Sequence, residues 1–109
     1  GNIVEYIARY ETTPQAPEQT FHPRHVLEIS EIGFPTTNVA KCVEELQSFG
    51  IQRRSSSPIK NNTLTFLGEY EDGVYIIAVP IGRRWIFSDK PAIATPIIIH
   101  TNHGIVKNV

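Results

Sequence analysis

The chain has 109 residues, of which 40% are hydrophobic and 19% charged, and its formal net charge is −1. These values are typical of one globular domain with a single core. They argue against a nucleic-acid-binding protein, which usually presents a strongly basic face, and they give no electrostatic pull toward an anionic membrane. No apolar run approaches the ~20 residues of a membrane span and no segment has the pattern of a signal peptide, so we expect a cytoplasmic protein.

The first 25 residues divide into a predicted strand and a linker. Residues 3–10, "IVEYIARY", show partial alternation of apolar and polar side chains. Residues 11–25 contain three prolines among Thr and Gln. Because proline fixes its own φ and restricts the residue before it, this stretch is predicted to be extended.

A strand followed by a helix is the clearest local pattern. Residues 26–34, "VLEISEIGF", read as a strand, and Thr37 or Asn38 can cap the element that follows. The next apolar side chains recur at steps of three and four and predict a helix with one apolar stripe: Val39, Cys42, Val43, Leu46 and Phe49. Gly50 stands where a left-handed helix stop belongs.

The second half of the chain reads as strands and loops. We expect a short polar strand at 51–56, a strand at 63–70, a turn at Asp72-Gly73 and a strand at 74–81 that is buried on both faces. A loop at 82–91, "GRRWIFSDKP", then precedes a strand at 92–102 that Pro96 interrupts. The tail from His103 onward is ambiguous.

One helix beside a mostly antiparallel sheet predicts an α+β fold. The sheet should curl over the helix at 39–49 on one face and leave a concave face free for a ligand or partner. A ferredoxin-like regulatory domain fits less well, because that fold needs a second helix and no second helical stripe is visible.

The order strand–helix–strand–strand–strand, beginning "EIGFPTTNVAKCVEELQSFGI", resembles the βαβββ module of the vicinal oxygen chelate superfamily. That group includes glyoxalase I, bleomycin-resistance proteins and extradiol dioxygenases. The opening "GNIVEY" is similar to the end of such modules, where Gly-Asn starts the last strand and a Glu follows, here Glu5. "GEYEDGVYIIAVPIGRRW" resembles a glyoxalase-like subgroup.

The resemblance also implies how the chain is divided. Residues 1–10 correspond to the last strand of a preceding module, 11–25 to a linker, 26–95 to one βαβββ module, and 96–109 to the first strand of a further module or a tail. We therefore expect a fragment or half of a larger glyoxalase-like protein. Because such modules pair edge to edge, the expected partner is a second copy or the preceding module.

Enzymes of the superfamily hold a divalent metal ion with His and Glu side chains, and the resemblance implies where the ligands would fall. Glu5 and Glu31 are candidate metal ligands. The two other positions fall near Ile76 or Ile77 and on Pro96, none of which can ligate. The metal site is thus incomplete in this chain, and a metal ion would need donors from another module or chain.

Each of these residues also has a simpler interpretation. Glu31 can be a carboxylate that lines the cup and pairs with an Arg, and Glu5 can be an ordinary polar strand residue. The four histidines lack the spacing of a HExxH zinc motif and are expected to be solvent-exposed or strand-end residues: His22, His25, His100 and His103. The single cysteine, Cys42, is expected to be a small buried hydrophobe.

The loop "GRRW" is the most chemically suggestive segment. Arg83 and Arg84 offer forks that fit a carboxylate or phosphate, and Trp85 offers a flat apolar wall. Together with Glu31 they are the candidate substrate-binding residues. The alternative is a solvated arginine pair with Trp85 packed on the helix or on another module.

Two functional hypotheses remain from the sequence. The first is a glyoxalase-like module that binds a small molecule and has lost most metal ligands. The second is part of a metal-dependent lyase or dioxygenase whose active site another module or chain completes. No catalytic residue can be assigned, because no nucleophile elbow or phosphate-binding glycine motif is present.

Overall fold

A computed structural model of the chain describes residues 20, 22–26, 29–68, 75–86 and 88–108. The predicted strand at 3–10, most of the Pro-rich linker and the predicted turn at Asp72-Gly73 lie outside the described residues. So does the candidate metal ligand Glu5.

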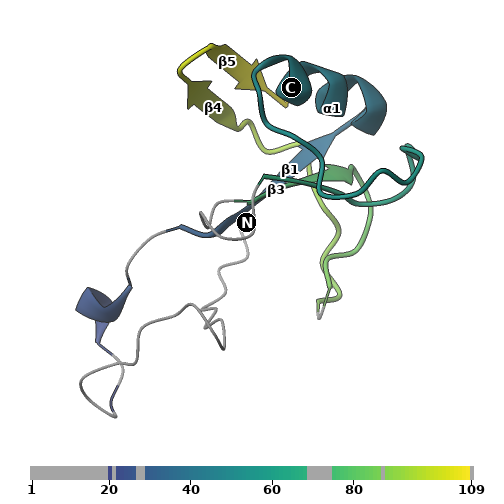
Figure 1. Ribbon diagram of the computed structural model, residues 1–109. Helices are drawn as coiled ribbons and strands as arrows, with labels where there is room; N and C mark the ends of the chain where they lie inside the picture. Colours follow the sequence, from purple (N-terminus) through teal and green to yellow (C-terminus); the bar gives the residue numbers. More distant parts are fainter. Residues whose placement is uncertain (1–19, 21, 27–28, 69–74, 87, 109) are drawn as a thin grey trace.

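The described part is an α+β fold with one α-helix and two small sheets, which confirms the predicted fold class (Figure 1). The elements in chain order are a 3-10 helix η1 (Pro23–His25), β1 (Glu31–Thr36), α1 (Val39–Ser48), β2 (Thr65–Leu67), β3 (Tyr75–Pro80), β4 (Ile98–Thr101) and β5 (Gly104–Lys107).

The main sheet has the strand order β1-β3-β2 and is mixed, where the sequence predicts a mostly antiparallel sheet. β1 pairs with β3 in parallel and β2 pairs with β3 antiparallel, so that Gly33 and Phe66 flank Ile77 from the two sides. β1 lies at the edge of this sheet, where Pro35 is tolerated although it has no N–H for a ladder. The polar strand expected at 51–56 is reduced to an isolated bridge between Arg53 and Leu67.

Helix α1 forms where the apolar stripe predicts it. The Asn38 side chain caps its first turn by accepting a 3.0 Å hydrogen bond from the backbone N–H of Lys41. Gly50 follows the helix with φ 85°, the left-handed conformation expected of a helix stop.

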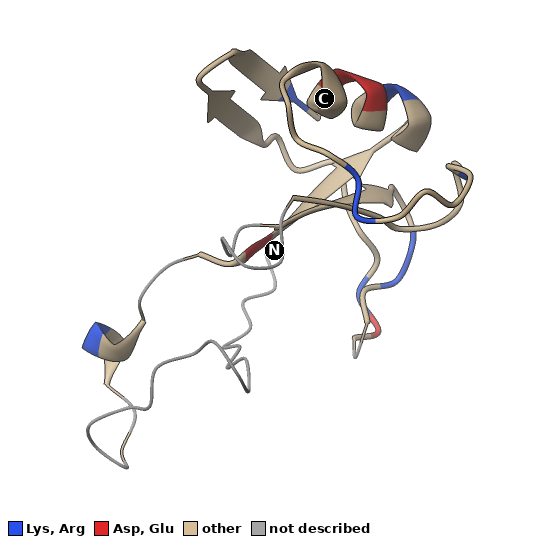
Figure 2. Ribbon diagram, viewed as in Figure 1, with Lys and Arg blue, Asp and Glu red and all other residues tan. Residues whose placement is uncertain are grey.

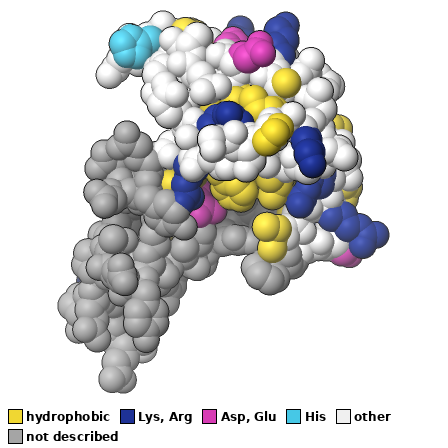
Figure 3. All heavy atoms as spheres, turned by 45° about the vertical axis from the view of Figure 1, so that its right-hand side comes forward, with side chains coloured by type: hydrophobic (Ala, Val, Ile, Leu, Met, Phe, Trp, Pro, Cys, Tyr) yellow, Lys and Arg dark blue, Asp and Glu magenta, His cyan; other side chains and the backbone are white. Residues whose placement is uncertain are grey.

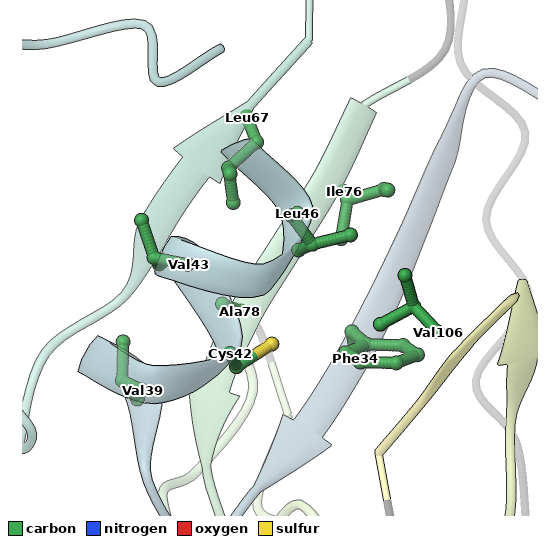
Figure 4. Close-up of a cluster of buried hydrophobic side chains, with 9 residues drawn as sticks. All are labelled: Phe34, Val39, Cys42, Val43, Leu46, Leu67, Ile76, Ala78 and Val106. Carbon is green, nitrogen blue, oxygen red and sulfur yellow. The ribbon is translucent and has the colours of Figure 1, made fainter. Parts of the chain in front are cut away.

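The core lies between α1 and one face of the sheet. Helix, sheet and C-terminal hairpin all contribute buried side chains to this cluster (Figure 4): Phe34, Val39, Cys42, Val43, Leu46, Leu67, Ile76, Ala78 and Val106. Burying these apolar groups is the main contribution to stability that the described residues show.

Residues 98–107 form the hairpin β4–β5, which packs against the module. Val106 is fully buried in the main cluster. The buried Asn108 side chain donates hydrogen bonds of 2.8 Å to the carbonyls of Pro35 and Thr95 and accepts one of 2.7 Å from the N–H of Ile97. The C-terminal segment is therefore anchored to β1 by both apolar packing and hydrogen bonds.

Among the described residues, none of the helices has the length and apolar character that crossing a lipid bilayer would require.

Candidate functional site

The two faces of the main sheet have different surroundings. Phe34, Ile76 and Leu67 point toward α1 and belong to the core. Side chains alternate along a strand, so the neighbours of these residues point to the opposite face. We call this opposite face the open face; its residues are Glu31, Gly33 and Pro35 of β1, Phe66 of β2, and Tyr75, Ile77 and Val79 of β3.

Trp85 lies directly on the open face at Gly33. A Cβ atom added to Gly33 would lie 2.3 Å from Cη2 of Trp85, so the indole ring contacts the bare backbone of β1. Only glycine permits so close an approach at this position. The absent side chain of Gly33 is therefore what seats the indole on the sheet.

Backbone hydrogen bonds hold the segment that carries Trp85. The N–H of Gly82 donates to the carbonyl of Ala92 at 2.8 Å, and the N–H of Ala92 donates to the carbonyl of Arg83 at 2.7 Å. The N–H of Trp85 donates to the carbonyl of Lys90 at 3.1 Å. The predicted loop at 82–91 is thus an irregular hairpin that presents Trp85 from a fixed backbone.

The open face is less exposed to solvent than the sequence predicts. Pro35 and Val79, at one end of it, are buried although they point away from α1. The row formed by Ile77 and Phe66 remains partly exposed, with Phe66 39% accessible. Tyr75, at the other end, is buried as well, so the accessible part of the face is Ile77, Phe66 and the exposed side chain of Glu31.

An arginine lies at that second end of the face. The guanidinium carbon of Arg54 stands 4.5 Å from the centroid of the Tyr75 ring, within the range of a cation–π contact. The N–H of Arg54 donates a 3.0 Å hydrogen bond to the carbonyl of Phe66, which fixes its backbone beside β2. Glu31 pairs with Tyr75 in the sheet register and is exposed.

The structure brings together two of the four candidate substrate-binding residues. Glu31 and Trp85 share the open face. Gly33, on which Trp85 lies, is two residues from Glu31 along β1, a distance of about 7 Å. Arg83 is half-buried and donates a 3.0 Å hydrogen bond from Nη1 to the carbonyl of Arg84, whereas Arg84 itself is exposed. The interpretation of Trp85 as a residue packed on the helix is not what the described structure shows, because Gly33 faces away from α1.

The comparison with protein families agrees with this architecture. The model of the toxoflavin-degrading enzyme family matches residues 29–83, which is half of the chain. The chain belongs to the toxoflavin-degrading enzyme family. This family is part of the vicinal oxygen chelate superfamily, so the match supports the resemblance at the superfamily level. None of the curated proteins matches the chain.

The match to the toxoflavin-degrading enzyme family covers the whole main sheet, α1 and Arg54. It ends at Arg83, so Trp85 and the return of its hairpin lie outside the matched residues. The family match thus includes the strands that form the open face but does not include Trp85, whose position on Gly33 comes from the structure alone.

The described residues do not fit a metal centre. They contain no group of three or more His, Cys, Asp or Glu side chains that could hold an ion together. On β3, Glu31 pairs with Tyr75, and the residue after Tyr75 is Ile76, whose side chain has no atom that can bind a metal ion. For this member of the toxoflavin-degrading enzyme family, metal binding by Glu5 and Glu31 stays a prediction that needs donors from beyond the described part.

The remaining polar candidates lie away from the open face. His22 and His25 belong to η1, where the His22 side chain accepts a 3.1 Å hydrogen bond from the N–H of Arg24. His22 is exposed and His25 is partly buried. His100 lies on β4 and His103 in the turn after it, and both are exposed, as strand-end polar residues would be.

Cys42 is buried in the core on α1, as predicted. Its burial, with a smaller contribution from the negative charge of Glu45, raises the pKa of the thiol to about 11. The thiol is therefore protonated at neutral pH and cannot serve as a nucleophile there.

Sequence reasoning missed Gly33, Phe66, Arg54 and Tyr75 as parts of this face. One signal could have found the first: a glycine inside a strand pattern often marks a close approach of another group. The Arg54–Tyr75 contact joins residues that are far apart in the chain, and no local pattern indicates it.

Proposed function

We propose that this module binds a planar small molecule on the open face, between Trp85 and Phe66, and that its own metal site is incomplete. The observation that carries the proposal is the indole of Trp85 seated on the bare backbone of Gly33. A rigid aromatic wall on an otherwise apolar row favours stacking of a flat ring. Since the family is named for toxoflavin degradation, toxoflavin is the first compound to test.

The dimensions of the face support this ligand class. Gly33, Ile77 and Phe66 lie in one row across three strands. The indole covers Gly33, so the uncovered part of the row runs from Ile77 to Phe66, about one strand spacing of ~5 Å, and a flat ring lying there would meet the indole on one side and Phe66 on the other. Ile77 provides a partly buried apolar floor between the two aromatic side chains.

Polar groups border the row on two sides and would orient the ligand. Glu31 can accept a hydrogen bond at the end of β1. Arg83 and Arg84 precede Trp85 on the same hairpin, and either could contact an electronegative ligand group at its rim. We propose these three residues, with Trp85, as the substrate-binding set.

A second candidate function follows from the family name, which denotes an enzyme. In that case this module is one half of a metal-dependent enzyme of the superfamily, a lyase or dioxygenase. A second copy or a preceding module would close the cup and add metal ligands to Glu5 and Glu31. Adding divalent ions to the protein and following the disappearance of toxoflavin tests this candidate, with Glu31→Gln as the variant expected to lose metal affinity.

The binding proposal can be tested with the chain's only tryptophan, Trp85. Titration with toxoflavin should quench or shift its fluorescence in a saturable manner. Calorimetry should then show that Trp85→Ala loses about tenfold in affinity, the equivalent of one stacking contact. The matched control is Ile105→Ala, which truncates an exposed apolar side chain on the C-terminal hairpin and should leave affinity unchanged.

Equal affinities of wild type and Trp85→Ala would show that the ligand does not lie on this face. Absence of saturable binding, with or without added divalent ions, would contradict both candidate functions.

A further inference from the structure

A basic groove lies beside the main sheet, along the loop that connects α1 to β2. It has a volume of about 630 Å³ and is lined by residues 53–66: Arg53, Arg54, Ser55, Ser57, Pro58, Lys60, Thr63, Leu64, Thr65 and Phe66. This volume falls in the range of small-molecule sites. Figure 3 shows Lys and Arg side chains gathered around apolar side chains on this side of the molecule.

The charge of the groove differs from that of the chain. The described residues that line it include two arginines and one lysine and no aspartate or glutamate, whereas the whole chain has a formal net charge of −1. In Figure 2, acidic residues colour α1 and the start of β1, while the loop that lines the groove carries only basic ones. A concave surface with one sign of charge concentrates ligands of the opposite sign.

Hydrogen bonds within the loop shape the groove. Nη1 of Arg53 donates a 2.6 Å hydrogen bond to the carbonyl of Ser57, and the hydroxyl of Ser55 contacts that of Ser57 at 2.9 Å. At the other end, the N–H and hydroxyl of Thr63 both donate to the carbonyl of Lys60 at 3.2 Å. These contacts hold the two ends of the loop in closed turns, so the groove does not have to be ordered by its ligand.

The tip of the loop is tied to the helix as well. The side-chain carbonyl of Asn61 accepts a 3.0 Å hydrogen bond from the N–H of Ala40 in the first turn of α1. At its base, the bridge between Arg53 and Leu67 joins the loop to β2. The groove is therefore anchored to both the helix and the sheet.

We propose that this groove binds a small organic anion, with a phosphate or carboxylate at Arg53 and Lys60 and a flat apolar group against Phe66. Arginine and lysine are the side chains that recognise such anions. The hydroxyls of Ser55 and Thr63 already donate within the loop, whereas the hydroxyl of Ser57 accepts from Ser55 and keeps its own hydrogen to donate to a ligand. Phe66, 39% accessible, borders both this groove and the open face, but Arg53 and Lys60 belong to the groove alone.

The proposal can be tested by NMR titration with phenyl phosphate, using phenol as the uncharged analogue. Phenyl phosphate should shift the amide signals of residues 53–66 in a saturable manner, and phenol should not at the same concentration. Inorganic phosphate should bind the same residues more weakly, because it lacks the ring that contacts Phe66. Raising the salt from about 0.1 M to about 1 M, which shortens the Debye length from ~10 Å to ~3 Å, should weaken binding.

Substitutions separate a specific site from a general charge effect. Lys60→Gln should weaken phenyl phosphate binding several-fold, and adding Arg53→Gln should bring the loss to about tenfold or more. Lys107→Gln removes the same charge from an exposed position on β5 and should have no effect. Because Arg53→Gln also breaks the contact to Ser57, Arg53→Lys serves as the second variant and should retain most of the affinity.

Shifts scattered outside residues 53–66, or equal losses in Lys60→Gln and Lys107→Gln, would overturn the proposal. Its outcome is separable from that of toxoflavin binding, because Trp85→Ala should leave the affinity for phenyl phosphate unchanged.

Discussion

Replacing Gly33 with alanine tests the packing on which the open face depends. The new Cβ atom would lie 2.3 Å from Cη2, 2.9 Å from Cζ3 and 3.2 Å from Cζ2 of Trp85. Carbon atoms in contact prefer about 3.5–4.0 Å, so the indole must move away by about 1.2 Å or more. Gly33 is not one of the glycines with positive φ, so the backbone itself accepts alanine.

The two effects on stability have opposite signs. Overpacking of this kind costs about 1–3 kcal/mol. Replacing a strand glycine by alanine otherwise gains about 0.5–1 kcal/mol through the lower entropy of the unfolded chain. We therefore expect Gly33→Ala to be neutral or to lower the free energy of unfolding by up to about 2 kcal/mol in the wild-type background. In the Trp85→Ala background, where no indole is displaced, Gly33→Ala should raise the free energy of unfolding.

A double-mutant cycle measures this coupling. Urea unfolding of wild type, Gly33→Ala, Trp85→Ala and the double variant, followed by far-UV circular dichroism, should give an interaction energy of about 1–3 kcal/mol. Independently, Gly33→Ala should shift the emission of Trp85 to the red as the ring becomes more hydrated. If Gly33→Ala had the same effect on stability with and without the indole, Trp85 would not lie on Gly33.

Two further predictions concern the core and the C-terminal hairpin. Burial raises the pKa of Cys42 from 9.0 to about 11, so the free energy of unfolding should not depend on this thiol below pH 9 and should fall as the pH rises from 9 toward 11. At pH 8, iodoacetamide should label the native protein about 100-fold more slowly than the urea-unfolded chain. Equal labelling rates would be inconsistent with a buried thiol. Asn108→Ala removes three hydrogen bonds from a buried side chain and should cost about 1–3 kcal/mol, with faster amide exchange at Val106. The control Asn102→Ala, in the exposed turn of the hairpin, should change neither quantity, and a silent Asn108→Ala would mean that the hairpin is not anchored by this side chain.

Local patterns predict the helix and the fold class well. The spacing of Val39 through Phe49, a capping residue and Gly50 are all short-range signals, and α1 begins and ends close to where they place it. The strand at 26–34 is placed too early: β1 starts at Glu31 and continues through Pro35, because an edge strand accepts a proline. The strand expected at 92–102 begins at Ile98, two residues after Pro96.

The C-terminal hairpin and the site depend on contacts that the sequence does not encode locally. The turn at Asn102-His103 lacks the Asn-Gly pair that makes a hairpin easy to predict. Gly104 has φ 155° and lies against the ring of Phe49, so the hairpin is positioned by a residue from the end of the helix. Likewise, Trp85 meets Gly33 across about half of the chain. Such pairings require the tertiary fold, and periodicity alone predicts only the elements that make them.

The most direct test of the binding proposal is an NMR titration of the labelled protein with toxoflavin. We predict saturable shifts at the amides of Gly33, Ile77 and Phe66 and at the indole N–H of Trp85, with α1 unaffected. Shifts confined to α1 or to the β4–β5 hairpin, or no shifts at all, would contradict the assignment of the open face as the binding surface.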